Sequence, residues 1–204
     1  SKWSTAVRKK LILIGGGGHC KSCIDVIEQS EQYEIAGIID KQENIGQMVL
    51  GYEIIGIDNQ IETLATEGFE FLITIGQKRT PKVRQKLYNE LMRFNAKIAM
   101  IISPRAYVSQ YAKIGEGSII MHDALVNASA SIGKNCIINT KALIEHDAII
   151  GDHCHISTGA VINGGADIKQ GSFFGSNGTS KEYVASSEEA FIKAGTLFLG
   201  EGVE

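Results

Sequence analysis

The chain has 204 residues, of which 44% are apolar and 21% are charged, so its composition is that of an ordinary globular protein. Its formal net charge is −3 and its longest basic run is Arg8-Lys9-Lys10, which argues against nucleic acid as a partner. No apolar run approaches the roughly 20 residues that span a bilayer, so we expect no membrane partner. These features predict a cytoplasmic protein without a secretory signal, whose four cysteines are free thiols.

The first hundred residues alternate between apolar strands and amphipathic helices. In chain order, the predicted strand, helix, strand, strand and helix cover residues 11–14, 20–29, 33–39, 71–75 and 81–94. Strands that alternate with helices are typical of a parallel sheet. We therefore expect residues 1–101 to form a small Rossmann-like α/β domain.

Four consecutive glycines, Gly15 to Gly18, separate the first strand from the first helix. Such a loop can present backbone N–H groups to a phosphate at the helix N-terminus. Cys20 stands where a dinucleotide fingerprint has its third glycine, and the domain is too short for two mononucleotide halves, so a mononucleotide or nucleotide-sugar is favoured over NAD. Asp40 ends the second strand and is placed to accept hydrogen bonds from a ribose or base. The alternative is that the glycines only form a tight turn.

From Ile102 onward the chain follows a period of six residues, which is not a helical period. A branched apolar residue or a phenylalanine opens thirteen consecutive hexads: Ile102, Val108, Ile114, Ile120, Val126, Ile132, Ile138, Ile144, Ile150, Ile156, Ile162, Ile168 and Phe174. A small residue follows each of them by four positions. A hexad fits one short strand and one turn, so three hexads make a triangular coil of 18 residues.

Stacked coils of this kind predict a parallel β-helix over residues 102–204. Gly115, Gly133 and Gly151 recur at the coil spacing, and neighbouring coils are expected about 4.8 Å apart, as paired strands are. The branched residues then fill the interior. Cys136 and Cys154 fall at the small interior position, which predicts structural cysteines rather than nucleophiles. The register weakens but continues after residue 178, with polar coils as the end of a solenoid requires.

His146 has the most informative context of the five histidines. It follows the inward Ile144 by two residues, so we expect it to point outward near a corner of the β-helix. The adjacent Asp147 carboxylate could then orient the imidazole as a general base. One coil later stands Gly164, whose bare N–H could serve as an oxyanion donor. The alternative is a surface histidine without function.

Metal binding is not expected. His146, His153 and His155 are close in the sequence, but no cysteine or carboxylate completes a convincing set of metal ligands.

Together these features resemble a known family, the sialic acid O-acetyltransferases and nucleotide-aminosugar N-acetyltransferases of bacterial glycan synthesis. The resemblance rests on the glycine loop ending in Gly18-His19, on Ile75-Gly76-Gln77, on the hexads and on Ile144-Glu145-His146-Asp147, and it spans essentially the whole chain. It is most similar to the bacillosamine-pathway type, which acetylates a UDP-linked 4-amino-4,6-dideoxy sugar. The resemblance implies a left-handed β-helix of hexapeptide repeats and a homotrimer with active sites between subunits.

The resemblance also implies a role for each matching residue. His146 would be the general base and Asp147 its orienting partner, in a direct transfer from acetyl-CoA to the amino group without an acyl-enzyme. The acceptor would be bound by Gly17, Gly18, His19, Asp40 and Asn139. The acetyl-CoA would be bound by His155, Gly164 and Gly165.

Three alternatives remain open at this stage. The enzyme could O-acetylate sialic acid or a related sugar, because a histidine base serves both reactions. The chain could be a non-catalytic nucleotide-sugar binding protein, although a histidine beside a carboxylate disfavours this. A Rossmann-type oxidoreductase is disfavoured by the missing third glycine and by a repeat that leaves no conventional substrate domain.

Overall fold

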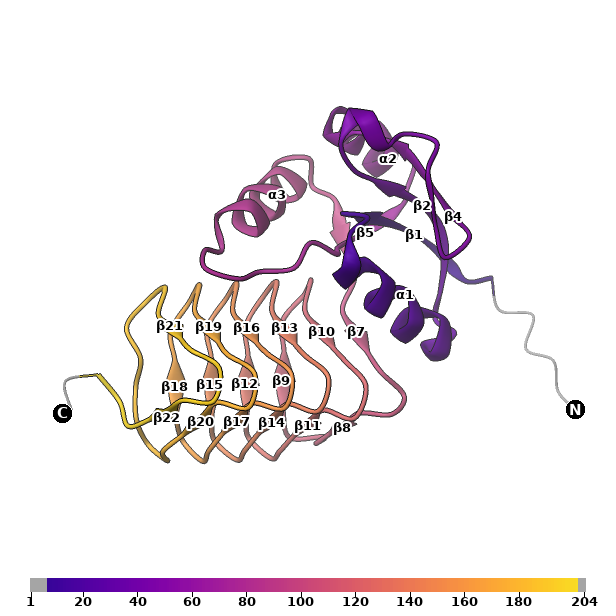
Figure 1. Cartoon of the computed structure of the whole chain (residues 1–204). Helices are drawn as coiled ribbons and strands as arrows, with labels where there is room; N and C mark the ends of the chain where they lie inside the picture. The colour runs from indigo at the N-terminus through magenta and orange to yellow at the C-terminus, as the bar shows by residue number, and fades with distance from the viewer. Residues whose placement is uncertain (1–6, 202–204) are drawn as a thin grey trace, which may run out of the picture.

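The structure, a computed structural model, describes residues 7–201 and consists of an α/β domain seated on a left-handed parallel β-helix (Figure 1). The α/β domain comes first in the chain, and the coils of the β-helix follow one another to the C-terminal end. The fold class predicted from the sequence is therefore confirmed.

The sheet of the α/β domain has the strand order β3-β4-β2-β1-β5-β6, and only the β3–β4 pair is antiparallel. Its strands are β1 (Lys9–Ile14), β2 (Tyr33–Ile39), β3 (Met48–Val49), β4 (Tyr52–Gly56), β5 (Glu70–Ile73) and β6 (Lys97–Ile98). Its helices are α1 (Gly18–Ser30), α2 (Ile61–Thr66) and α3 (Lys82–Arg93), with 3-10 turns η1 (Gln42–Asn44) and η2 (Asp58–Gln60). The central strand β1 is apolar because both faces of a parallel sheet are covered.

All five predicted elements of this domain are present, with shifted ends. α1 begins at Gly18 rather than at residue 20, and β5 ends at Ile73 rather than at residue 75. The apolar pattern does not predict β3, β4, β6 or α2, each of which is six residues or shorter. Among residues 7–201, no helix has both the length and the apolar character needed to cross a membrane.

Three parallel sheets form the sides of the β-helix, and each is named here after its first strand. The β7 sheet contains β7 (Ile101–Ile102), β10 (Ile119–Ile120), β13 (Ile137–Ile138), β16 (His155–Ile156), β19 (Phe173–Phe174) and β21 (Phe191–Ile192). The β8 sheet contains β8 (Tyr107–Val108), β11 (Leu125–Val126), β14 (Leu143–Ile144), β17 (Val161–Ile162), β20 (Thr179–Ser180) and β22 (Leu197–Phe198). The β9 sheet contains β9 (Lys113–Ile114), β12 (Ser131–Ile132), β15 (Ile149–Ile150) and β18 (Asp167–Ile168).

The predicted hexad register is confirmed. Each strand pairs with the strand 18 residues further on, as Ile120 does with Ile138, and the branched residues fill one interior core. The corners are sharp because one residue in many of them adopts a left-handed conformation, with φ between 54° and 62° at Asp123, Ser129, Asn135, Lys141 and Asp147.

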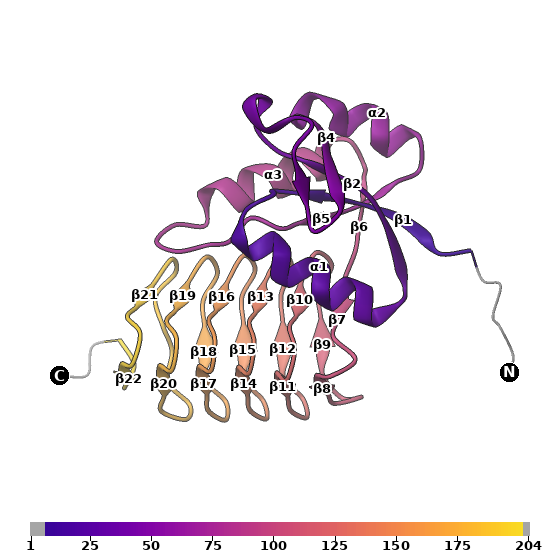
Figure 2. The ribbon, with the colours of Figure 1, turned by 45° about the vertical axis from the view of Figure 1, so that its right-hand side comes forward.

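The two domains share a hydrophobic core along the outer face of the β7 sheet. Ile101, Ile119 and Ile137 point out of the β-helix, yet they are fully buried in one cluster with Ile24 and Ile27 of α1. Figure 2 shows α1 lying along this side of the β-helix. The α/β domain is therefore held against one side of the β-helix and leaves the β8 sheet on the opposite side.

Candidate active site

His146 lies where the β8 sheet turns into the β9 sheet, and residues 145–148 and 163–166 are called the His146 corner below. Its side chain is 51% exposed, and its Nδ1 lies 2.9 Å from Oδ2 of Asp147. Because a carboxylate only accepts, Nδ1 carries the proton and Nε2 keeps a free lone pair. The ring is thus held with an accessible basic nitrogen, as a general base requires.

The ring of His146 rests against Gly164 in the next coil. A Cβ atom at Gly164 would lie 2.6 Å from Cε1 and 2.7 Å from Nε2 of that ring, so only glycine leaves the imidazole where it is. The N–H of Gly165 donates to the carbonyl of His146 at 2.9 Å. Within residues 7–201, the N–H of Gly164 has no hydrogen-bond partner. A free donor therefore stands beside the basic nitrogen.

A cavity of about 770 Å³ lies between the α/β domain and the β-helix, and it is called the inter-domain cavity below. The α/β domain contributes Gly18, His19, Ser22, Gly76, Gln77, Lys78, Arg79 and Thr80 to its lining. The β-helix contributes Asn139, Thr140, His155 and Thr158. These residues include two permanent cations and no carboxylate, a balance that favours an anionic ligand.

His155 is held rigidly in this cavity by both ring nitrogens. Its Nδ1 donates to the carbonyl of Gln77 at 2.6 Å, and its Nε2 accepts from Nδ2 of Asn139 at 3.0 Å. One neutral tautomer satisfies both bonds. Burial lowers the pKa of His155 to about 4, against the opposing effect of the Gln77 carbonyl, and the charge of Arg84 adds to the lowering. His155 is therefore a neutral hydrogen-bonding residue at physiological pH.

His19 is the second neutral histidine of the inter-domain cavity. Burial lowers its pKa to about 3, with smaller contributions from Arg84 and His155. Its Nε2 lies 3.3 Å from Sγ of Cys23, one turn further along α1. Neither histidine of the cavity is thus available as a cation.

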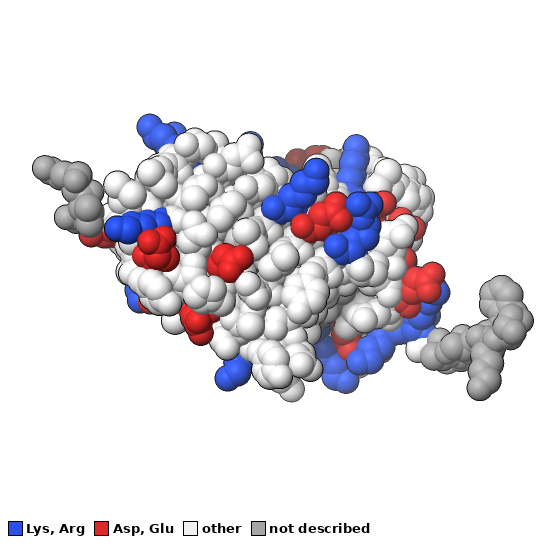
Figure 3. Space-filling model, turned by 90° about the horizontal axis from the view of Figure 1, so that it is seen from below, with Lys and Arg blue, Asp and Glu red and all other residues white. Residues whose placement is uncertain are grey.

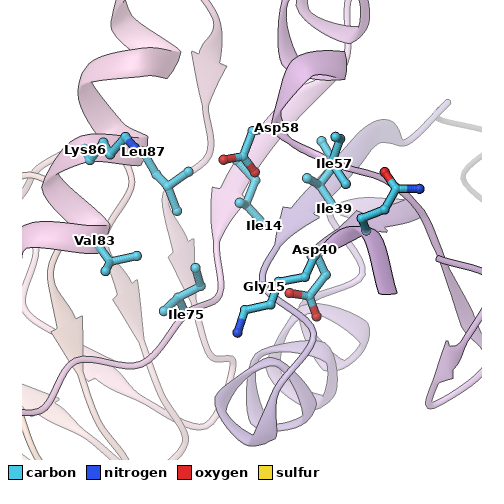
Figure 4. A pocket seen from close by; sticks show the side chains of 12 residues that line it. Ile14, Gly15, Ile39, Asp40, Ile57, Asp58, Ile75, Val83, Lys86 and Leu87 are labelled. Carbon is cyan, nitrogen blue, oxygen red and sulfur yellow. The ribbon is translucent and has the colours of Figure 1, made fainter. Parts of the chain in front are cut away.

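A second pocket of about 520 Å³ opens at the carboxyl ends of β1 and β2, and it is called the apolar pocket below. In Figure 4, Val83, Lys86 and Leu87 of α3 border it on one side, and Ile39 and Ile57 border it on the other. The carboxylates of Asp40 and Asp58 also line it. Apolar walls with a few polar groups at the switch points of a parallel sheet suit a nucleotide base and its ribose.

The glycine loop, residues 15–18, runs between the apolar pocket and the inter-domain cavity. Gly15 lines the apolar pocket and Gly18 lines the inter-domain cavity. Gly17 caps α1 without a side-chain hydrogen bond, and Gly17 and Gly18 face open space. The free N–H groups at the start of α1 thus lie between the two hollows, where a diphosphate would join a base to a sugar.

Within one chain, the predicted site residues form two separate groups. Gly17, Gly18, His19, Asp40, Asn139 and His155 lie around the glycine loop and the two hollows. His146, Asp147, Gly164 and Gly165 lie together at the His146 corner. The predicted acetyl-CoA ligands are therefore divided, because His155 is on the β7 sheet and Gly164 is on another corner of the same coil.

The cysteines are unsuited to nucleophilic catalysis. All four are buried and free, as predicted from the sequence for the interior pair Cys136 and Cys154. Burial raises the pKa of Cys20 and of Cys136 to about 11, and it also raises the pKa of Cys23 and of Cys154 well above the ordinary value. Among residues 7–201, no three His, Cys, Asp or Glu side chains are grouped as metal ligands.

Several residues that line the two pockets could not be predicted from the sequence. Lys86 and Leu87 belong to α3, and their approach to Asp40 depends on how α3 packs on the sheet. Lys78, Thr140 and Thr158 join the inter-domain cavity only because the two domains meet there. Gln77 carried a weak signal, since it belongs to the Ile75-Gly76-Gln77 motif that supports the family resemblance.

Two family comparisons match separate parts of the chain. Residues 10–91 match the PglD N-terminal domain, and residues 129–164 match the bacterial transferase hexapeptide, a unit of six repeats. A search of curated protein sequences returned no significant match.

Solved structures match nearly the whole chain. The acetyltransferase domain of PglB from Neisseria gonorrhoeae FA1090 is 28% identical with a TM-score of 0.86, and the match covers 95% of this chain and 92% of that domain. The same domain in complex with acetyl coenzyme A is 27% identical with a TM-score of 0.84, over 94% of this chain and 93% of that one. PerB from Caulobacter crescentus, in complex with CoA and GDP-perosamine, is 27% identical with a TM-score of 0.80, and the match covers 94% of this chain and 89% of PerB.

The matches agree with the geometry of both domains. The PglD-type domain contains the glycine loop and the apolar pocket, and the hexapeptide repeats contain His146 and Gly164. Residues 10–91 are thus similar to a PglD N-terminal domain and residues 129–164 to bacterial transferase hexapeptide repeats, and nearly the whole chain is similar to sugar acetyltransferases of known structure.

Proposed function

We propose that this chain transfers an acetyl group from acetyl-CoA to the amino group of a nucleotide-linked amino-deoxy sugar. The observation that carries the proposal is the pairing of His146 with Asp147 against the free N–H of Gly164. The complexes of related enzymes with acetyl coenzyme A, and with CoA and GDP-perosamine, support the choice of donor and acceptor.

His146 acts as the general base in this mechanism. Its Nε2 accepts a proton from the acceptor amine while the amine nitrogen attacks the thioester carbonyl carbon. Asp147 stabilises the imidazolium through the Nδ1 hydrogen bond. The tetrahedral intermediate then collapses, the C–S bond breaks, and the proton passes from Nε2 to the departing thiolate. No acyl-enzyme forms, in agreement with the buried thiols.

Gly164 stabilises the negative charge that develops on the thioester oxygen. Its N–H is unpaired in the structure, and the imidazole ring stands immediately beside it. A preorganised backbone donor in an oxyanion hole contributes about 10²-fold to 10³-fold to turnover.

The acceptor binds across the α/β domain. The nucleoside occupies the apolar pocket with its ribose near Asp40, and the diphosphate lies at the start of α1 near Gly17 and Gly18. The sugar enters the inter-domain cavity, where the Asn139 amide can hydrogen-bond to it. His155, which the resemblance assigns to acetyl-CoA, is assigned here to the sugar side because its Nε2 holds the Asn139 amide in place.

The site is complete only in a homotrimer, because the sugar-binding residues and the base lie on different corners of one chain. The β8 sheet lies between these corners, and its outer face carries the ladder Tyr107, Leu125, Leu143, Val161, Thr179 and Leu197. Tyr107 and Leu197 are 61% and 64% exposed. Figure 3 shows a broad area without charged side chains on this side of the molecule. An apolar strip of this kind is typical of an interface, and a neighbour there would bring its own His146 corner to the inter-domain cavity.

The first test measures thiol release from acetyl-CoA against a panel of UDP-, dTDP- and GDP-linked 4-amino-4,6-dideoxy sugars, with free sialic acid included. Release with an amino sugar would establish N-acetyl transfer. Release with sialic acid alone would move the assignment to O-acetyl transfer. Nucleotide-sugar binding without any thiol release would indicate a binding protein and contradict the proposal.

A further inference from the structure

Arg84 is a buried cation that no acidic side chain of residues 7–201 neutralises. It lies on α3 with 1% of its surface exposed, and it takes part in no ion pair among residues 7–201. Its Nε also has no hydrogen-bond partner there. The desolvation of a buried charge costs several kcal/mol, which hydrogen bonds offset only in part, so a well-packed apolar residue would often be at least as stable here. Its presence calls for a role other than packing.

The guanidinium connects the two domains. Its Nη1 donates to the carbonyls of Ile73 at 3.2 Å and of Ile75 at 2.7 Å, at the end of β5. Its Nη2 donates to the carbonyl of Asn135 at 3.1 Å and to its Oδ1 at 2.8 Å, at a corner of the β-helix. Asn135 is fully buried and in turn contacts Nδ1 of His153 at 2.9 Å. One side chain thus fixes the position of β5 relative to a β-helix coil.

The segment that Arg84 fixes leads directly into the inter-domain cavity. Gln77 follows Ile75 by two residues, and its carbonyl accepts the hydrogen bond from Nδ1 of His155. The side chain of Gln77 donates to the carbonyls of Gly171 and Ser172, so this loop contacts the β-helix at several points. Hydrogen bonds from Arg84 to the Ile75 carbonyl and from His155 to the Gln77 carbonyl therefore hold the two ends of one short backbone segment.

We propose that Arg84 is a positioning residue of the acetyltransferase site. By holding the Ile75 carbonyl against the Asn135 corner, it keeps the Gln77 carbonyl in place for His155 and leaves Nε2 of that ring directed to Asn139. The proposal rests on the proposed function, in which this cavity receives the acceptor sugar. Arg84 does not touch the substrate, so it acts through the geometry of His155.

The effect of the Arg84 charge can be separated from the effect of its hydrogen bonds, because both act on His155. The charged or titratable groups around its ring are Arg84 from α3, His19 from α1, and Lys78 and Arg79 from the loop that lines the same cavity. Arg84→Met removes both the charge and the hydrogen bonds. Arg84→Lys keeps the charge but has no planar group that could donate to both domains at once.

The experiment compares Arg84→Lys, Arg84→Met and the control Arg93→Met, an exposed arginine at the end of the same helix. Steady-state kinetics give separate KM values for the acceptor and for acetyl-CoA, and ¹³C-histidine NMR gives the titration midpoint of His155. We expect both Arg84 variants to lower kcat/KM for the acceptor by about 10-fold to 100-fold with an unchanged KM for acetyl-CoA. We expect the His155 midpoint to rise in Arg84→Met, because the Arg84 charge contributes to lowering it, and to rise less in Arg84→Lys. The Arg93→Met control should match the unmodified chain.

Folded Arg84 variants with unchanged acceptor kinetics and an unchanged His155 midpoint would overturn the proposal. If both variants fail to fold, Asn135→Gly provides the test, because glycine accepts the φ of 54° while the amide that binds Arg84 is lost. A smaller fall in acceptor kcat/KM is expected there, and unchanged kinetics would count against the role. The NMR titration needs no turnover, so failure of the positioning role is distinguishable from failure of the proposed function.

Discussion

At the scale of single residues, the His146 corner depends on the absence of a side chain as much as on the imidazole. The ring occupies the space that a Cβ at Gly164 would need. Gly164 has no positive φ, so backbone strain does not explain this glycine. Glycine is required at this position for a local steric reason, and this requirement can be tested separately from the role of His146 itself.

Replacement of the base should abolish most of the activity. We expect His146→Ala to lower kcat by about 10²-fold or more, because a positioned general base contributes that much. The matched control is Lys134→Ala, because Lys134 is exposed and occupies in its own corner the position that His146 occupies in the His146 corner. Steady-state kinetics and circular dichroism check the result. Near-normal turnover in a folded His146→Ala variant would refute the assignment of the base.

A methyl group at the neighbouring glycine should displace the base without unfolding the protein. We expect Gly164→Ala to lower kcat by about 10-fold to 100-fold while Tm changes little, because the imidazole can rotate away at small cost. The double variant His146→Ala/Gly164→Ala is the control, since the added Cβ then has no ring to move. If Gly164→Ala lowers kcat equally in both backgrounds, displacement of His146 is not the cause.

The neutral histidines of the inter-domain cavity make stability depend on pH. His19 and His155 have folded-state pKa values of about 3 and about 4, below the ordinary value of 6.5, so the unfolded chain binds more protons between these values. The free energy of unfolding should therefore fall as pH drops from about 6.5 toward 4, by up to about 1.4 kcal/mol per pH unit for each histidine. Urea titrations at fixed protein concentration measure this. His155→Gln should reduce the slope, and an unchanged slope would contradict the neutral buried state.

At the scale of elements, the hexad works because each position has a fixed environment in every coil. The branched residue always faces the interior, and the small residue always lies where two sides of the triangle converge. Gly133 shows how closely coils approach, since a Cβ there would lie 2.7 Å from the backbone nitrogen of Asp152 in the next coil. Neighbouring coils are therefore packed too tightly for a larger residue at Gly133.

An enlarged interior residue tests this packing. Ala142 is 1% exposed at a corner of the β-helix. We expect Ala142→Leu to lower the free energy of unfolding by about 1–3 kcal/mol through overpacking. Thermal and chemical unfolding measure the loss, and an unchanged Tm would show that the position is not a tight interior corner.

At the scale of the whole molecule, the proposed division of the site between two corners predicts complementation between inactive variants. His146→Ala damages the base and Asn139→Ala damages the sugar-binding side, so neither homotrimer should be active. In a trimer mixed at random from equal amounts, about a quarter of the sites would combine two intact halves, and activity should return to about that fraction. Differently tagged chains that are co-expressed and purified together provide the sample. Activity no higher than the average of the two parents would show that each site forms within one chain.

The repeat and the geometry of the His146 corner could be predicted from the sequence because both are local patterns. The hexad register predicts which residues face inward, and one coil length places Gly164 beside His146. The N-terminal sheet was predicted only in part, because β4 and α2 are too short to show a clear period.

The sequence by itself determined the coil, the register and the position of His146, because these depend on residues a fixed number of positions apart. Only the tertiary structure decided how the two domains meet. Arg84 and Asn135 are 51 positions apart, and Gln77 and His155 are 78 apart, and no period relates them. The packing of α1 and α3 on one side of the β-helix creates the inter-domain cavity, sets the hydrogen bonds of His155 and leaves the β8 sheet uncovered. This packing depends on the shapes of two surfaces rather than on any local pattern.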